Sequence, residues 1–87
     1  MYYKTIAATG AIIGQMGYAK SLLLTAGVDD AAATIYDNAS AATGNVVAKL
    51  AAKAGTSVFV DTESVHFYNG LYASITGTAP SLTTILV

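Results

Sequence analysis

His66 is the only histidine of the 87-residue chain and the side chain best suited to acid–base or metal chemistry. The nearest carboxylates and hydroxyls that could join it in a dyad, a triad or a metal site belong to Asp61, Glu63, Ser64 and Ser74. His66 lies between Val65 and Phe67 in an alternating stretch, so its side chain is expected on the opposite face of a strand from theirs. We interpret it as a surface or interface histidine and expect no catalytic residue and no enzyme.

A second group of polar residues offers oxygen ligands of the kind that calcium binds, on Asp29, Asp30, Asp37 and Asn38. Their spacing matches no calcium loop, and aspartate is frequent in turns for its turn chemistry alone. The glycines follow neither GxGxxG nor GxxxxGK[ST]. The absence of cysteine excludes disulfides, thiolate chemistry and cysteine-based zinc sites. We therefore expect neither a metal nor a cofactor.

The composition narrows the kinds of partner. Four basic and five acidic residues give a net charge of -1, and none of the basic residues is arginine, so the clustered positive charge that nucleic acid requires is missing. Hydrophobic residues make up 54% of the chain and charged residues only 10%. This balance is unusual for a soluble monomer and predicts that a protein partner covers part of the surface.

No segment has the pattern of a membrane span. Residues 6–24 are the most apolar stretch, but glycines, Gln15 and Lys20 interrupt it, and a spanning helix needs about twenty predominantly apolar residues. Lys4 and the Ile6-Ala7-Ala8 run are similar to the start of a signal peptide but lack a sustained apolar core and a cleavage site. We expect no membrane partner and synthesis in the cytoplasm.

Residues 65–77 carry the clearest structural signal. Apolar and aromatic residues alternate, pause at Asn69-Gly70 and alternate again, which predicts a tight β-hairpin. Tyr68 and Tyr72 flank the turn and are expected to interact across it. Such a hairpin needs further strands to bury its apolar face.

The rest of the chain supplies those strands. They are predicted at residues 17–27 (a central strand covered on both faces), 31–36, 56–61 and 81–87, with loops at 37–44, 54–55, 61–64 and 77–80. Residues 45–54 fit a helix or a strand, and the short connections favour a strand with Val46, Ala48, Leu50 and Ala52 inward. Seven to eight short strands predict an all-β fold, an antiparallel β-sandwich of jelly-roll-like form. Residues 1–16 are expected as an N-terminal arm or edge strand, and residues 17–87 as the sandwich domain.

The six tyrosines are the most informative aromatic set, because tyrosine is favoured at interfaces. We expect them in the core or in a subunit interface. The alternative is a carbohydrate site, in which tyrosines stack on sugars beside Asn38 or Asn69.

Several short runs resemble one class of protein. In chain order they are Ile35-Tyr36-Asp37-Asn38-Ala39-Ser40, Gly44 before an aliphatic strand, Ala54-Gly55-Thr56-Ser57, Val65-His66-Phe67, Asn69-Gly70-Leu71-Tyr72 and Ile75-Thr76-Gly77-Thr78. In the order of its strands and turns, the stretch 17–87 resembles short virion proteins of tailed bacteriophages with β-sandwich folds, of the head-decoration, cement or head-fibre kind.

The resemblance implies a non-enzymatic capsid decoration or cement protein located in the virion. It implies a homotrimer that binds the major capsid protein on the outer head shell and stabilises the shell. The residues we expect at the subunit or capsid interface are Tyr2, Tyr3, Ile6, Ile12, Ile13, Tyr68 and Tyr72. Two alternatives stay open: a phage tail, baseplate or fibre component, and a carbohydrate-binding β-sandwich module whose partner is a host surface glycan.

Overall fold

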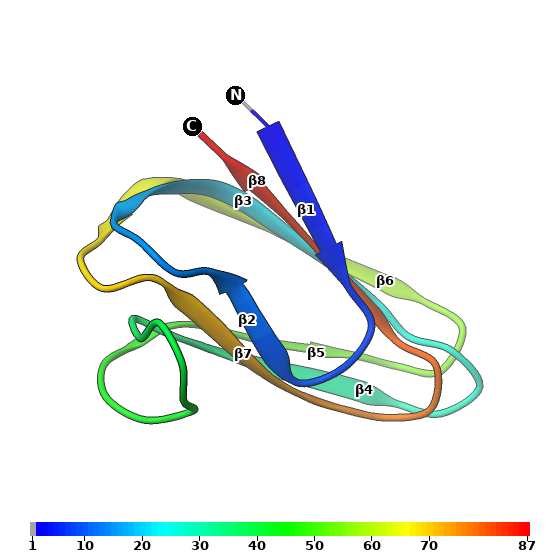
Figure 1. The fold of residues 1–87 in the computed structure, drawn as a ribbon. Helices are drawn as coiled ribbons and strands as arrows, with labels where there is room; N and C mark the ends of the chain where they lie inside the picture. Colours follow the sequence, from blue (N-terminus) through cyan, green and yellow to red (C-terminus); the bar gives the residue numbers. More distant parts are fainter. Residues whose placement is uncertain (1) are drawn as a thin grey trace.

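The computed structural model describes the backbone of residues 2–87 and the side chains from Tyr3 onward. It forms two four-stranded antiparallel sheets that pack face to face (Figure 1). The strands are β1 (Tyr2–Ile6), β2 (Gly10–Ile13), β3 (Gly17–Thr25), β4 (Ala31–Tyr36), β5 (Val46–Ala52), β6 (Ser57–Phe67), β7 (Leu71–Thr76) and β8 (Ser81–Leu86). The predicted all-β fold, an antiparallel β-sandwich, is confirmed.

The order of the strands follows a simple rule. Sheet A has the order β1-β8-β3-β6 and sheet B the order β2-β7-β4-β5. The chain can be followed as one long hairpin whose turn is the 37–45 loop. The paired strands of this hairpin are β1–β8, β2–β7, β3–β6 and β4–β5. The hairpin is wrapped so that successive pairs belong to alternate sheets. This is jelly-roll topology. The start of β1 and the end of β8 therefore lie side by side at one end of the sandwich (Figure 1).

The core lies between the sheets and is built from the inward-facing residues of nearly every strand. Its largest fully buried apolar side chains are Ile12, Leu22, Leu24, Ile35, Phe67, Leu71, Leu82 and Leu86. Buried alanines of β3, β4 and β7 fill the space between them, so the sheets approach closely despite the short chain. Thr84 is the exception, because it is a polar residue with no exposed surface in the middle of β8.

The predicted hairpin at residues 65–77 is wrong. β6 belongs to sheet A and β7 to sheet B, so the chain crosses between the sheets at Asn69-Gly70 instead of pairing with itself. Gly70 is buried with a φ of 141°, and an added Cβ would lie 2.5 Å from the carbonyl oxygen of Ile13. Glycine is required at this position because the backbone of another loop approaches it closely. In the sequence, a glycine required for such an approach cannot be distinguished from a glycine of a tight hairpin turn. Tyr68 and Tyr72 consequently do not pair.

The predicted break between two strands at residues 61–64 is a bulge within β6. Ala19 of β3 is paired with Val65 and Ser21 with Asp61, so residues 62–64 of β6 lie opposite Lys20 alone. Glu63 and Ser64 have positive φ values of 53° and 61°, which removes them from the ladder without ending the strand.

Bulges also changed which faces two predicted strands present. β3 is a central strand, as predicted, but only its inward face is covered. The bulge at Lys20 places Leu22 in the core and Leu23 on the exposed face. Residues 46–52 form a strand, as favoured, with Leu50 and Ala52 buried. Val46 is exposed instead of inward, because the register with β4 shifts next to it.

The N-terminal residues supply the outer strand of each sheet. β1 pairs with β8 at one edge of sheet A, and β2 pairs with β7 at one edge of sheet B. Within the described part of residues 1–16, both apolar clusters are thus strands of the same sandwich.

Candidate functional site

The surface of sheet A that faces away from the core carries several exposed aromatic and aliphatic side chains. We call it the A face, and its side chains alternate with the buried residues of β1, β8, β3 and β6. One row across the sheet contains Thr5, Thr83, Leu23 and Phe59, and the next contains Tyr3, Ile85, Ser21 and Asp61. Phe59 is 63% exposed and Tyr3 is 70% exposed. These two side chains lie on the opposite edge strands β1 and β6, with Ile85 and Leu23 between them, and an exposed apolar patch on a sheet face is typical of an interaction surface.

The polar groups on the A face largely satisfy one another. The hydroxyls of Thr5 and Thr83 lie 2.9 Å apart, and those of Thr25 and Ser57 lie 3.1 Å apart. Each pair bridges neighbouring strands between residues on the same face. A hydroxyl that already has a hydrogen-bond partner loses less free energy when water is removed from it. These two pairs therefore lower the desolvation cost of covering the A face.

Three aromatic rings extend the A face at the end where β6 finishes. The rings of Tyr18 and His66 are stacked with their centroids 4.6 Å apart, and the ring of Tyr68 is tilted against His66 at 4.3 Å. Tyr68 is 67% exposed and Tyr18 is 47% exposed, whereas His66 between them is half-buried. The prediction that His66 points away from the core is confirmed, and its neighbours are tyrosines.

Asp37 fixes the turn that carries Tyr68. One of its carboxylate oxygens accepts the backbone N–H of Asn69 at 2.8 Å, and both accept that of Tyr68 at 3.0 and 3.1 Å. Burial raises the pKa of Asp37, but the backbone N–H donors of Tyr68, Asn69 and Gly70, helped by the charge of His66, outweigh it and lower that pKa overall. The carboxylate therefore has a structural role, because it ties the β6–β7 crossing to the end of β4.

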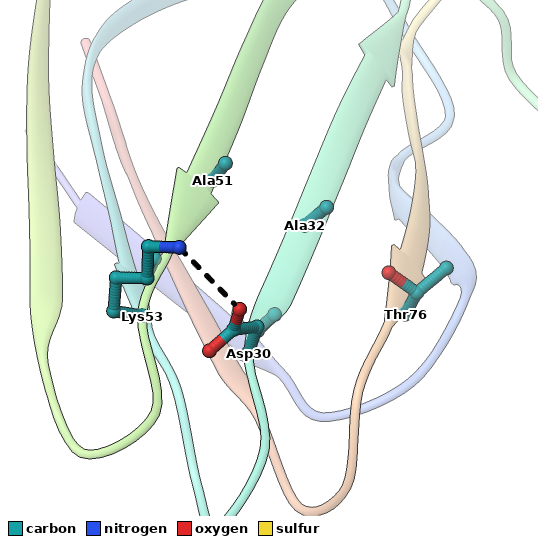
Figure 2. Close-up of a pocket in the computed structure, with 7 residues that line it drawn as sticks. Asp30, Ala32, Ala51, Lys53 and Thr76 are labelled. Atoms are coloured by element: carbon teal, nitrogen blue, oxygen red, sulfur yellow. Dashed lines mark ion pairs between the residues drawn. The ribbon is translucent and has the colours of Figure 1, made fainter.

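Sheet B presents a different outer surface, made mainly of small side chains. A shallow depression of about 260 Å³ lies there, and Figure 2 shows the lining residues Ala32, Ala51 and Thr76 with Asp30 and Lys53. The only charged groups of its lining are paired with each other, since Lys53 Nζ lies 3.8 Å from the Asp30 carboxylate. The same carboxylate group accepts the backbone N–H of Ala54 at 2.9 Å. The hollow thus results from small side chains, and its polar groups are engaged in holding loops.

The aspartates considered for calcium do not meet. Asp29 and Asp30 precede β4 and Asp37 follows it, so the length of that strand separates them. Asp29 accepts the hydroxyl of Thr78, and each of the three aspartates is thus bonded to a different loop. Within residues 2–87, no three histidine, aspartate or glutamate side chains converge as a metal site requires.

The residues expected at an interface are distributed over several parts of the sandwich. Tyr3 lies on the A face, and Tyr68 lies at its end. Tyr72 is half-buried on the outer surface of sheet B, in register with Tyr36. Ile6 and Ile13 are partly buried and pack against the core. Ile12 is only 2% exposed, so its side chain belongs to the core of the sandwich. The side chain of Tyr2 lies outside the described residues.

Three residues of the A face were missed by sequence reasoning as interface candidates, Leu23, Phe59 and Ile85, and Tyr18 was included only among the six tyrosines expected in the core or a subunit interface. Alternation within the predicted strands was a usable signal for Phe59 and Ile85, because their neighbours on both sides are aliphatic or β-branched core residues. Tyr18 and Leu23 lie an odd number of residues apart, and only the bulge between them brings them to one face.

Comparisons with known proteins add no identification. No family model, no curated protein and no solved structure matches the chain. Among the described residues there is also no helix long and apolar enough to cross a membrane. A functional conclusion therefore depends on the geometry described above.

Proposed function

We propose that this chain is a non-enzymatic structural protein of a bacteriophage particle, most directly a capsid decoration or cement protein. In this role it sits on the outer head shell, contacts the major capsid protein and self-associates, so that it stabilises the shell. The chain is synthesised in the host cytoplasm and becomes part of the finished virion.

The observation that carries the proposal is the A face. A chain of 87 residues with 10% charged residues exposes Tyr3, Phe59 and the Tyr18–His66–Tyr68 cluster on one side of a rigid sandwich. A protein that functions by packing against other proteins needs such a surface. The jelly roll supports the proposal as an architecture that viral capsid proteins use, although lectins use it too and a fold alone does not define a function.

The candidate catalytic and metal-binding groups support a non-enzymatic role. His66 is held between two tyrosine rings, and Asp37 is bonded to backbone N–H groups. Neither is arranged as a base beside a nucleophile, which general acid–base catalysis requires.

A tail, baseplate or fibre component is the neighbouring alternative, since the same fold and surface serve there at a different copy number. A carbohydrate-binding module is favoured by a specific observation, the exposure of Tyr18 and Tyr68 close to the exposed Asn69. Against it, the rings of this cluster are packed on one another, which occupies ring faces on which a sugar would stack.

The test is the copy number of this polypeptide in purified particles of the phage that encodes it, measured by quantitative mass spectrometry against the major capsid protein. We expect hundreds of copies in a simple ratio to the shell protein. A dozen copies would move the protein to the tail or to a unique vertex. Absence from the particle would refute the structural role, and binding of a host glycan by the purified chain would then favour the carbohydrate module.

A further inference from the structure

We infer that the A face is buried against the A face of a second copy of this chain, in a two-fold dimer of stacked sheets. The inference rests on the self-association in the proposed function and names the surface and the symmetry of that contact, a two-fold dimer in place of the homotrimer that the resemblance implies. Two sheets that pack in this way lie about 10 Å apart with their strands about 30° from parallel.

The first step is the area that the face offers. Four aromatic side chains on the A face or at its end, those of Tyr3, Tyr18, Phe59 and Tyr68, are between 47% and 70% exposed. Since a tyrosine or phenylalanine contributes about 150–250 Å² when fully buried, these four offer about 500 Å². Leu23, Ile85 and the threonines between them bring the face close to the ~800 Å² per partner of a stable interface.

The second step is the cost of removing water. The hydroxyl pairs Thr5–Thr83 and Thr25–Ser57 keep their hydrogen bonds when the face is covered, because both partners belong to the same chain. The carboxylate of Asp61 accepts the N–H of Glu63 at 2.9 Å. These bonds lower the cost of removing water from this part of the face, so the apolar area around them counts toward affinity.

The third step is the choice of partner. An apolar face is best covered by another apolar face, and the outer surface of sheet B offers less exposed aromatic area, because Tyr36 and Tyr72 there are half-buried and most other side chains are small. The comparable surface on a second copy is therefore the same A face, and a patch that packs on itself does so about a two-fold axis.

The experiment is sedimentation equilibrium of the isolated full chain over a range of concentrations. We expect a mass of twice the 8.8 kDa of the chain. Phe59→Glu places an unpaired charge in the contact and should raise the dimer dissociation constant at least ~100-fold. The matched control is Val28→Glu, which makes the same charge change at a 78% exposed valine in the β3–β4 loop and should leave the dimer intact.

The folded state of each variant is checked by circular dichroism and urea unfolding. Should Phe59→Glu fail to fold, Phe59→Ser removes the apolar side chain without adding a charge and is expected to weaken the dimer in the same direction. A wild-type monomer at ~100 μM, a trimer, or equal dissociation of both glutamate variants would overturn the inference. These results are independent of the virion copy number, so the dimer can fail while the structural role stands, and the reverse also holds.

Discussion

Replacing Thr84 by valine should make this protein more stable. Thr84 has no exposed surface, and its hydroxyl has no hydrogen-bond partner among the described residues. It is in register with Leu22 of β3 on one side and with the exposed Lys4 of β1 on the other, and it shares the inward face of β8 with Leu82 and Leu86. Valine has nearly the same shape and the same β-branched preference for a strand, and it removes the unsatisfied group.

The size of the effect follows from two terms. A buried hydroxyl without a partner costs about 1–3 kcal/mol, and the methyl group that replaces it gains up to ~0.8 kcal/mol by leaving water. Because the site must accept a slightly larger group in a tightly packed core, we expect a net gain of about 1–2 kcal/mol in the free energy of unfolding. For a domain of this size that corresponds to a rise in Tm of about 4–16 °C.

Urea unfolding followed by circular dichroism measures this change, with the slope of the transition checked for two-state behaviour. The control is Thr83→Val on the same strand, which removes a hydroxyl bonded to Thr5 at 2.9 Å and should lower the free energy of unfolding by about 0.5–1 kcal/mol. The reasoning is refuted if Thr84→Val leaves stability unchanged or lowers it, since the hydroxyl must then have a partner.

Three further predictions concern the end of the sandwich near the β6–β7 crossing. Asp37→Asn should lower the free energy of unfolding by about 1 kcal/mol, measured by urea unfolding at pH 7. The reason is that a neutral amide accepts the N–H groups of Tyr68 and Asn69 less strongly than a carboxylate does. Equal stability of the variant and the wild type would contradict the structural role of the Asp37 carboxylate. Since the folded-state pKa of Asp37 is lowered, its contribution is fully present above its unfolded pKa of about 3.9 and is lost as the pH falls through the folded value. A pH titration of stability should therefore fall less steeply below about pH 4 in Asp37→Asn than in wild type, and parallel curves would refute the assignment. Gly70→Ala should lower the free energy of unfolding by more than about 2 kcal/mol, because the added Cβ would meet the Ile13 carbonyl. The control is Gly14→Ala, which has open space around it and should change that free energy by no more than about 0.5 kcal/mol. Similar losses for both variants in urea unfolding would show that the close approach at Gly70 does not limit stability.

The strands were largely predictable because local signals agreed with the fold. Residues 31–36 form β4 with the predicted bounds, and β8 begins at the predicted Ser81, one residue beyond the only proline. Both segments contain consecutive β-branched residues between clear turn residues, and no bulge falls within β8.

The strand pairing was less predictable, because it depends on contacts between distant parts of the chain. Asn69-Gly70 has the composition of a hairpin turn, and the decisive fact is that the backbone near Ile13 approaches Gly70 in space. No local pattern carries that information. The wrapped hairpin of the jelly roll requires most connections to cross between sheets, so a turn signal indicates where the chain reverses but not which strand it then joins.

The A face itself arises from two matched bulges, and this explains why periodicity did not reveal it. In an unbroken strand, residues an odd number apart face opposite sides, so Phe59 and His66 of β6 would lie on different faces. The irregular stretch at residues 62–64 of β6 and Lys20 of β3 interrupt both strands at the same point, and the phase of each is reversed there. The Thr62 hydroxyl donates to the carbonyl of Ala19 and thereby ties the two interruptions together. As a result the aromatic cluster at one end and the Leu23–Phe59 row at the other lie on one continuous surface. Bulges of this kind cost ladder hydrogen bonds, and here they produce a single large apolar face where an uninterrupted sheet would have divided the same side chains between core and solvent.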